Sequence, residues 1–234
     1  MQQEIIKIDL GGVNCYLSKV GDSFVLFDTG GHITVDKKFT NRLEELDLQL
    51  EKAGCKPGNL RAIILTHGDN DHVANAAFLR RKYQTIIAMH KDDIDLVQNV
   101  TLDKMMESFR YSSVVLKLMF VLMKKFITKV TAKAMEDFEK FSPDVILNDG
   151  DNLSAYGLDA TIIHLPGHTP GSIGILMVEG NLIVGDTLAN MKKPVPSPNA
   201  CDFKQLKSSI KRLKAMKLKT IYPGHGNCFE AVEI

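Results

Sequence analysis

The chain has 234 residues, of which 44% are hydrophobic and 24% charged, and its formal net charge is +1. This length is typical of one domain with a sizeable core, so we expect residues 1–234 to form a single domain. A net charge this close to zero gives no global field that attracts nucleic acid, and we expect no nucleic-acid partner. No apolar run reaches the roughly 20 residues that a stable membrane span needs.

The cysteines and the start of the chain bear on location. The four cysteines are far apart in the sequence and include no CxxC pair: Cys15, Cys55, Cys201 and Cys228. This spacing favours reduced thiols over a zinc ribbon or a disulfide framework. The first ten residues lack a basic region followed by an apolar run, so no export signal is visible. We therefore expect a cytoplasmic protein.

Short apolar runs alternate with turn residues in the first third of the chain. The turns Gly11-Gly12 and Gly21-Asp22 separate three expected strands, at 5–10, 15–18 and 24–27. A helix is expected from about Thr40 to Ala53, with leucines on one face and Gly54 as its stop. The elements expected next are a strand over 61–65, a helix over 73–82 and a strand over 85–89.

Residues 101–141 break this rhythm, because they contain no strong turn residue and predict helix throughout. Within them, Val114–Met123 is apolar on nearly every face except at Lys117, and we expect this side to be buried. Eight basic and four acidic residues lie between Lys104 and Lys140. We interpret the segment as a helical insertion. It is either packed on its own domain, a lid across the mouth of the active site, a homodimer face or a membrane-surface element.

Strands dominate again after residue 146. The expected elements are strands over 160–165, 173–178 and 182–184, a Pro-rich loop over 193–198, an amphipathic helix over 203–216 and a strand over 220–222. The chain therefore has two similar halves, each with strands followed by helices. This pattern predicts an α+β fold in which two sheets pack together and the helices lie outside.

Seven histidine and aspartate residues share one sequence context, because each lies near Gly or Thr in a loop after an apolar run. They are His67, Asp69, Asp71, His72, His168, Asp186 and His225. Imidazole suits zinc and iron, and a carboxylate can bridge two cations. Any one of these loops alone is weak evidence, since a glycine-flanked histidine is usually only a turn. Together, in order and each after a strand, they predict a pair of divalent metal ions.

The spacing indicates how the ligands divide between two ions. His67 and Asp69 are two residues apart on an extended loop, so both side chains can turn to one cation. Asp71 and His72 are adjacent at the start of a helix and project in different directions, so they can serve a second cation. Asp186 has two oxygens to share between the metals. Among the other histidines, we expect His32 near the site mouth and structural roles for His90 and His164.

These motifs resemble the metallo-beta-lactamase superfamily over essentially the whole chain. The family pattern Thr-His-x-His-x-Asp-His corresponds to Thr66–His72, and the later motifs match GHTPGS at His168, GDT at Asp186 and PGHG at His225. The resemblance implies a four-layer αββα sandwich with two metals at one edge of its sheets. It also implies that Asp28, in Phe27-Asp28-Thr29-Gly30, supports the site without binding metal.

Asp69 departs from the family pattern, where most members have histidine. A carboxylate is a harder ligand than imidazole, so the site should tolerate iron or manganese better than a histidine-rich one. Zinc remains the expected metal. The flavodiiron members of the family place a glutamate here and hold two irons, but they also carry a flavodoxin domain for which this chain is too short. The alternative is a weak first site, with only the second metal bound.

The resulting functional hypothesis is a binuclear metal-dependent hydrolase. Metals lower the pKa of bound water from about 15.7 toward about 7, and a bridging hydroxide would attack a small ester, lactone, thioester or phosphodiester. Asp71 is the expected catalytic residue, orienting the nucleophile and moving a proton. Two alternatives remain, a non-haem di-iron redox protein and a metal-binding scaffold without turnover. Glyoxalase II relatives add a helical domain after the last histidine, and here only nine residues follow His225.

Overall fold

The computed structural model describes residues 4–32 and 39–234. A six-stranded sheet in the order β1-β2-β3-β4-β5-β6 holds most of the first half of the chain. Its strands are β1 (Glu4–Asp9), β2 (Asn14–Val20), β3 (Ser23–Phe27), β4 (Leu60–Ile64), β5 (Ile87–His90) and β6 (Val145–Leu147). The first three strands pair antiparallel, whereas β3 to β6 pair parallel, so the carboxyl ends of β4 and β5 lie at the same edge.

A second sheet, of five strands in the order β13-β12-β9-β8-β7, comes from the second half of the chain. Its strands are β7 (Ala160–His164), β8 (Ile173–Met177), β9 (Leu182–Gly185), β12 (Thr220–Pro223) and β13 (Phe229–Glu230). A small ribbon of β10 (Leu188–Ala189) and β11 (Val195–Pro196) follows β9. Because β9 and β12 run parallel, the loops that follow them emerge side by side.

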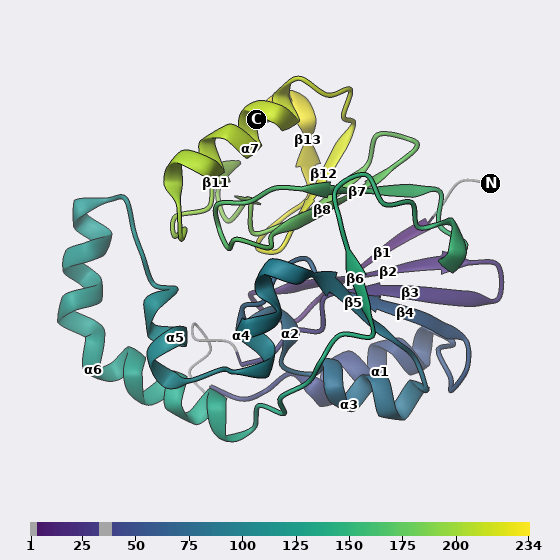
Figure 1. Cartoon of the computed structure of the whole chain (residues 1–234), viewed down its shortest axis with the longest axis horizontal. Coiled ribbons are helices and arrows are strands. Elements are labelled where there is room, and N and C mark those ends of the chain that lie inside the picture. Colours follow the sequence, from purple (N-terminus) through teal and green to yellow (C-terminus); the bar gives the residue numbers. More distant parts are fainter. Residues whose placement is uncertain (1–3, 33–38) are drawn as a thin grey trace.

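Helices cover the outer face of each sheet, which gives four layers (Figure 1). Helices α1 (Leu43–Ala53) and α3 (Ala76–Tyr83) lie against the first sheet, and α7 (Phe203–Lys214) lies against the second. The remaining helices are α2 (Asn70–Val73), α4 (Ile94–Gln98), α5 (Leu102–Glu107) and α6 (Val114–Glu136), with short 3-10 turns at Lys91–Asp93, Ser154–Tyr156 and Ala231–Glu233. The expected α+β fold with a four-layer αββα arrangement is confirmed.

The alternation of side chains along the strands explains the layers. In β3, Val25 and Phe27 face the second sheet, whereas Phe24 and Leu26 pack toward the helices. In the second sheet, Ile162 joins the inter-sheet core and Ile163 packs in the α7 layer. Apolar side chains on both faces need cover on both sides, because successive residues of a strand point in opposite directions. The sandwich thus buries both faces of each sheet.

Several predicted boundaries were wrong. The helix expected from about Thr40 begins at Leu43, and the helix expected over 73–82 is α3, which begins at Ala76, whereas Val73 ends the separate short helix α2. At this break, the Asn75 side-chain amide donates to the Thr29 carbonyl at 2.8 Å, which ties the turn to the loop that follows β3. The strand expected over 85–89 spans Ile87–His90.

Residues 101–141 are not helical throughout, which corrects the sequence prediction. Helix α5 ends at Glu107 and α6 begins only at Val114. Ser113 explains the restart, because its hydroxyl accepts from the Leu116 backbone N–H as an N-cap. The prediction that Val114–Met123 is buried was also wrong, since Val114, Leu118 and Leu122 are largely exposed.

Candidate metal centre

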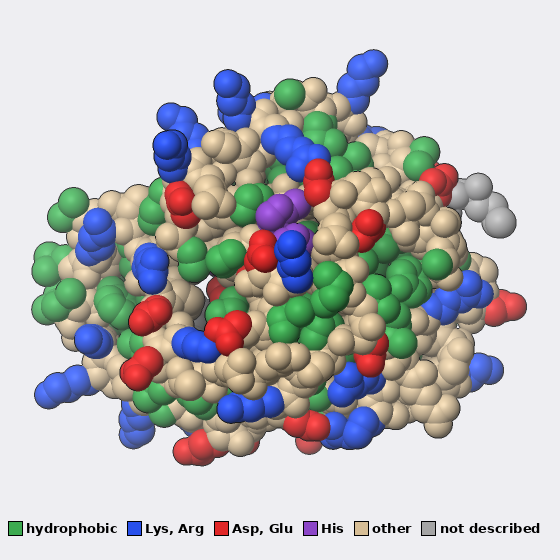
Figure 2. Space-filling model, in the orientation of Figure 1, with side chains coloured by type: hydrophobic (Ala, Val, Ile, Leu, Met, Phe, Trp, Pro, Cys, Tyr) green, Lys and Arg blue, Asp and Glu red, His purple; other side chains and the backbone are tan. Residues whose placement is uncertain are grey.

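All seven predicted residues lie together at the edge where the two sheets meet. Each one follows the carboxyl end of a strand or lies in the adjoining helical turn. His67 and Asp69 follow β4, Asp71 and His72 lie in α2, and His168, Asp186 and His225 follow β7, β9 and β12 respectively. Histidine side chains are visible near the middle of the face drawn in Figure 2, with acidic side chains beside them. Loops that are distant in the sequence thus converge because their strands end at one edge.

His67, Asp69 and His168 form one group. One possible ligand atom from each residue lies within 4.8 Å of the others. The Asp69 carboxylate is 3.1 Å from His168 Nε2 and 4.0 Å from His67 Nε2. This group is nearly enclosed, since the two histidines are almost completely buried.

Asp71, His72 and His225 form a second group on the same 4.8 Å criterion. His72 Nε2 and His225 Nε2 are 3.5 Å apart, and Asp71 Oδ2 is 3.5 Å from His225 Nε2 and 4.0 Å from His72 Nε2. Asp71 and His225 are partly exposed, whereas His72 is buried. The second group therefore faces solvent more openly than the first.

Asp186 lies between the two groups. Its Oδ2 is 3.0 Å from His225 Nε2 and 3.7 Å from His168 Nε2, and its Oδ1 is 3.3 Å from His72 Nε2. One carboxylate therefore contacts histidines of both groups. A bridging ligand between two cations needs this placement.

Three buried atoms test whether the site fits metal ions. His67 Nε2, His168 Nε2 and Asp186 Oδ1 are buried and make no hydrogen bond of regular geometry within the part of the chain that the structure describes, although other ligand atoms of the site lie close to them. Buried polar atoms are almost always satisfied, and each orphan requires an explanation. Imidazole nitrogens and carboxylate oxygens that converge without regular hydrogen bonds to one another fit divalent metal ions.

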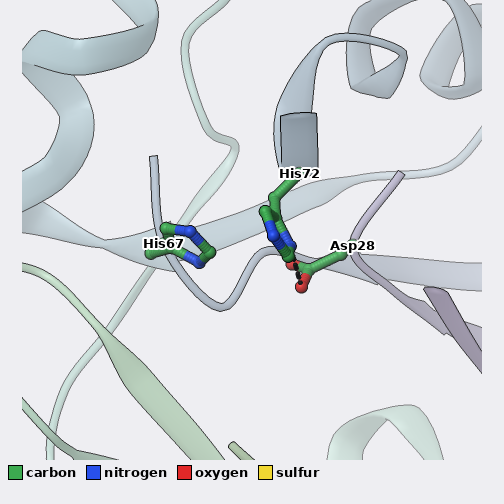
Figure 3. Close-up of side chains that lie close together, drawn as sticks. All are labelled: Asp28, His67 and His72. Atoms are coloured by element: carbon green, nitrogen blue, oxygen red, sulfur yellow. Dashed lines mark hydrogen bonds and ion pairs between the residues drawn. The ribbon is translucent and has the colours of Figure 1, made fainter. Parts of the chain in front are cut away.

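Each of the four histidines in the site has a polar contact at Nδ1, on the side of the ring away from the proposed metals. The Nδ1 atoms lie 2.9 Å from Thr66 Oγ1 for His67, 2.9 Å from Asp28 Oδ2 for His72, 3.1 Å from the Asn199 carbonyl for His168 and 2.6 Å from the Gly12 carbonyl for His225. Figure 3 shows the contact of Asp28 with His72, beside His67. A partner on Nδ1 fixes the ring so that Nε2 can face a metal.

Asp28 has its carboxylate engaged on the outer side of the site. Besides His72 it accepts from the Thr66 backbone N–H and from the Thr66 hydroxyl, each at 2.8 Å. Asp28 also forms a close group with His67 and His72, but these hydrogen bonds already occupy both of its oxygens. Its position matches the supporting role that the sequence resemblance implies.

The site concentrates opposite charge in a buried place. Burial lowers the pKa of His168 and His225, but the neighbouring carboxylates, Asp69 for His168 and Asp186 for His225, outweigh burial and raise each pKa to about 9. Burial, with His72 and His168 nearby, lowers the pKa of His67 to about 3. Burial opposes protonation of His72, but Asp186 and Asp71 raise its pKa as well. A cation that binds here would therefore have to displace protons from His72, His168 and His225.

Gly224 has no room for a side chain. A Cβ atom at this position would overlap Asp186 Oδ1 and lie 2.7 Å from His72 Cε1. The Gly224 backbone N–H donates to the Gly185 carbonyl at 2.8 Å, which joins the loops that follow β12 and β9. Glycine at this position lets the His225 loop pass directly over Asp186.

A family model described as the metallo-beta-lactamase superfamily matches residues 8–225. The chain belongs to the metallo-beta-lactamase superfamily. It is 28% identical to a hydroxyacylglutathione hydrolase of Haemophilus influenzae, over 97% of this chain and 92% of that protein. It is 26% identical to a probable polyketide biosynthesis zinc-dependent hydrolase of Bacillus velezensis, over 80% of this chain and only 62% of that protein.

The fold is similar to a solved metallo-beta-lactamase family protein of Thermus thermophilus. The TM-score is 0.68 at 20% identity, with 99% of this chain and 75% of that one covered. At this identity the similarity concerns the fold alone. It agrees with the two-sheet sandwich and with the sequence resemblance.

The metal centre opens into a cavity of about 340 Å³. Asp69, Asp71, Asp186 and His225 contribute to its floor. Much of the opposite wall comes from the helical insertion, and its lining residues include Lys104, Met105, Phe109, Val130, Thr131 and Ala134. The second half of α6 therefore faces the metal centre, as expected for a lid. His32, which was expected near the site mouth, and Ser197 of the Pro-rich loop also line this cavity.

Sequence reasoning missed Asp93, which joins two loops of the metal site. Its buried carboxylate accepts from the backbone N–H of Gly68 at 2.8 Å, the backbone N–H of Gly171 at 2.6 Å and the Thr169 hydroxyl at 2.6 Å. Burial raises the pKa of Asp93 to about 6. These contacts hold the His67–Asp69 loop against the His168 loop.

Asn14 was also missed as a contributor to the site. Its side-chain amide donates to the carbonyls of Pro223 and Gly226, at 2.9 and 2.8 Å. These two hydrogen bonds hold the loop that carries His225 in place. In the sequence, Asn14 only precedes the strand expected at 15–18, which gives no signal of this role.

His90, Asp92 and His164 form a further close group outside the metallo-beta-lactamase site. The two imidazole rings stack with centroids 4.1 Å apart and planes 13° from parallel. A metal binds in the plane of an imidazole ring, and two stacked rings cannot both direct a nitrogen at one ion. This arrangement agrees with the structural role expected for His90 and His164.

Proposed function

We propose that the protein binds two divalent metal ions and hydrolyses a small thioester or ester with an apolar portion. The coarser assignment, a metal-dependent hydrolase, follows from the superfamily and from relatives named as hydrolases. The observation that supports the finer one is the placement of Asp186 between two groups of histidine and aspartate ligands. Zinc is the proposed metal, as in the name of the Bacillus velezensis relative.

The proposed ligands divide as the sequence spacing suggested. His67, Asp69 and His168 would hold one ion, Asp71, His72 and His225 the other, and Asp186 would lie between them. When bound, the metal pair supplies an activated water and polarises the bond to be cleaved. Every histidine then contributes Nε2, because its Nδ1 is already engaged.

Asp71 is proposed as the residue that orients the water and carries a proton. Its side chain is about one-third exposed and lines the cavity, so it can reach both the metal site and a substrate. Burial raises the pKa of Asp71 above its ordinary value, against the opposing effect of His72 and His225. A carboxylate within reach of the attacking water can accept its proton.

The cavity supports an apolar substrate portion. Leu96, Val100, Met105, Phe109 and Val130 line it, and Lys104 is the cation among its lining residues. The Haemophilus influenzae hydroxyacylglutathione hydrolase is matched over 92% of its own length. This similarity supports a thioester as the substrate.

A substrate panel tests this proposal. The zinc-loaded protein would be assayed with an acyl-glutathione thioester, an aryl ester, a lactone and a phosphodiester, each with and without a chelator. Turnover of the thioester or the ester, lost on chelation and restored by zinc, is expected. Metal-dependent turnover of only the phosphodiester would replace the proposed substrate class, and metal binding without any turnover would indicate the scaffold alternative.

A larger side chain on the part of α6 that lines the cavity, here called the roof, should raise KM for large acyl groups more than for small ones. Ala134 is buried and lines the cavity, so Ala134→Phe would occupy the space proposed for the apolar portion. We expect KM for a long-chain acyl thioester to rise about tenfold or more, while an acetyl thioester changes little. Such a loss corresponds to about 1.4 kcal/mol, within the range for overpacking a closed site.

Ala132→Phe is the matched control, because Ala132 lies on the same helix but does not line the cavity. Equal effects of the two substitutions on long and short acyl groups would show that the roof does not contact the substrate.

Asp69 offers a test of the first metal site. Imidazole is a softer ligand than carboxylate and suits zinc better, so Asp69→His should raise zinc affinity at this site. Competition with a chromophoric chelator would measure it, and His168 should remain a ligand. A fall in zinc affinity with an unchanged melting temperature would mean that Asp69 does not occupy a ligand position.

Location and assembly remain proposals. Four free cysteines support a reducing, cytoplasmic environment. Dimerisation through the helical insertion and the absence of nucleic-acid binding stay predictions from the sequence.

A further inference from the structure

The first half of α6 presents a large apolar surface to solvent. Val114, Leu118, Val121 and Leu122 are between 60% and 78% exposed. Further exposed apolar side chains on this helix are Val115, Met119, Met123 and Phe126. In Figure 1 α6 lies at one end of the molecule, and Figure 2 shows hydrophobic side chains gathered at that end. A contiguous exposed patch of this kind marks an interaction site, unlike single exposed residues.

The same helix is strongly basic. It contains Lys117, Lys124, Lys125, Lys129 and Lys133, and its one acidic residue is Glu136 at the carboxyl end. All five lysines are exposed, and none forms an ion pair with any residue in the described ranges 4–32 and 39–234. Helical spacing of three and four residues places Lys125 and Lys129 on the same side as Leu118 and Val121. The outward side is thus apolar in the first half and basic in the second.

The positive charge of α6 distinguishes two possible binding partners for this surface, a second copy of the chain and an anionic membrane. A second copy of the chain packed through α6 would bring two sets of five lysines together, with almost no acidic residue on the helix to offset them. A surface that is both apolar and anionic complements the helix instead. An anionic lipid bilayer offers acyl chains for the apolar half and charged headgroups for the lysines.

The dimensions suit shallow insertion. Within the ranges that the structure describes, no helix is long and apolar enough to cross a membrane. The ten apolar-rich residues at the start of α6 span about 15 Å at 1.5 Å per residue, which allows the tip to enter one leaflet. Val130, Thr131 and Ala134 remain packed against the cavity, so docking needs no unfolding of the roof.

We propose that the exposed face of α6 docks on the surface of an anionic lipid bilayer. The apolar first half enters the leaflet, and the lysines of the second half contact anionic headgroups. This surface is separate from the metal centre, so binding does not depend on metal or turnover.

Vesicle binding tests this proposal with the full-length chain. Sedimentation would compare vesicles of phosphatidylcholine alone with vesicles of equal parts phosphatidylcholine and phosphatidylglycerol. We expect at least about tenfold tighter binding to the anionic vesicles, weakened by 500 mM salt because ions screen the lysines. The chain has no tryptophan, so Leu122→Trp adds a single fluorophore. Its emission should shift to the blue on binding and be quenched by brominated acyl chains.

Two matched pairs of variants separate α6 from general surface effects. Changing Leu118, Val121 and Leu122 to serine should abolish binding, whereas Val178→Ser, at an exposed apolar position on another part of the fold, should not. Reversing Lys124, Lys125 and Lys129 to glutamate should abolish binding, whereas reversing the exposed lysines Lys207, Lys211 and Lys214 of α7 should weaken it much less. Circular dichroism would verify that each variant is folded.

Three results would overturn the proposal. The first is equal binding to neutral and anionic vesicles. The second is equal loss of binding in the α6 and α7 lysine variants. The third is a stable dimer in light scattering that the serine variant converts to a monomer, which would assign the apolar face to a second copy of the chain.

Discussion

Replacing Asp186 by alanine is expected to lower kcat/KM of the metal-loaded enzyme by about 10³-fold or more. Asp186 contacts histidines from both ligand groups, at 3.7 Å from His168 in the first and 3.0 Å from His225 in the second. Its loss removes the carboxylate shared by the two proposed metal sites and leaves buried histidines without their counter-charge. Removing one electrostatic group from an active site already costs about 10²–10³-fold. Metal content should fall from two ions per chain to one or none.

Asp159→Ala is the matched control, because Asp159 is exposed and lies at the far end of β7 from His168. Steady-state kinetics and elemental analysis would be measured on both variants at saturating zinc. An Asp186→Ala enzyme that retained two ions and more than a tenth of the wild-type kcat/KM would show that Asp186 is not the shared ligand.

Replacing Asp93 by alanine is expected to destabilise the protein by about 3 kcal/mol and to lower metal affinity about 10- to 100-fold. The carboxylate accepts from three donors on two loops, and its loss leaves those donors buried without an acceptor. Asp93 itself is not among the proposed ligands. Its effect on metal binding is transmitted through the positions of the His67 and His168 loops, as for other residues that support metal ligands.

Asp92→Ala controls for the neighbouring position, since the Asp92 side chain is 44% exposed and lies 3.6 Å from His90 Nδ1, outside the proposed metal ligands. Denaturant unfolding with excess chelator would give the stability change, and zinc competition would give the affinity. A loss of stability without any change in zinc affinity would assign Asp93 to the fold alone.

The seven site residues could be named from the sequence because each follows a recognisable strand and lies near glycine or threonine. The strand ends then determine their convergence: β9 and β12 are parallel neighbours, so Asp186 and His225 had to emerge together. Asp93 could not be found in this way. Its partners Gly68 and Gly171 are 25 and 78 residues away, and no local pattern signals such contacts.

Helix boundaries and burial were harder to predict for a physical reason. The α2–α3 break falls at Ala74 and Asn75, where the sequence has no glycine or proline, and α6 begins after the Ser113 cap. The two-residue strands β10, β11 and β13 are too short to leave an apolar pattern. The exposure of α6 was also not predicted. Its apolar composition indicates that the helix needs a contact partner, but it does not indicate whether that partner is the rest of the chain or another surface. That the whole chain forms one domain stays a prediction.

Anomalous diffraction at the zinc absorption edge, from crystals of the zinc-loaded protein, tests the central claim most directly. We expect two peaks per chain about 3.5 Å apart, the usual spacing of paired catalytic metals. One should be held by His67, Asp69 and His168, the other by Asp71, His72 and His225, with Asp186 between them. A single peak, or two peaks with Asp186 or His225 turned away from both, would contradict the binuclear account.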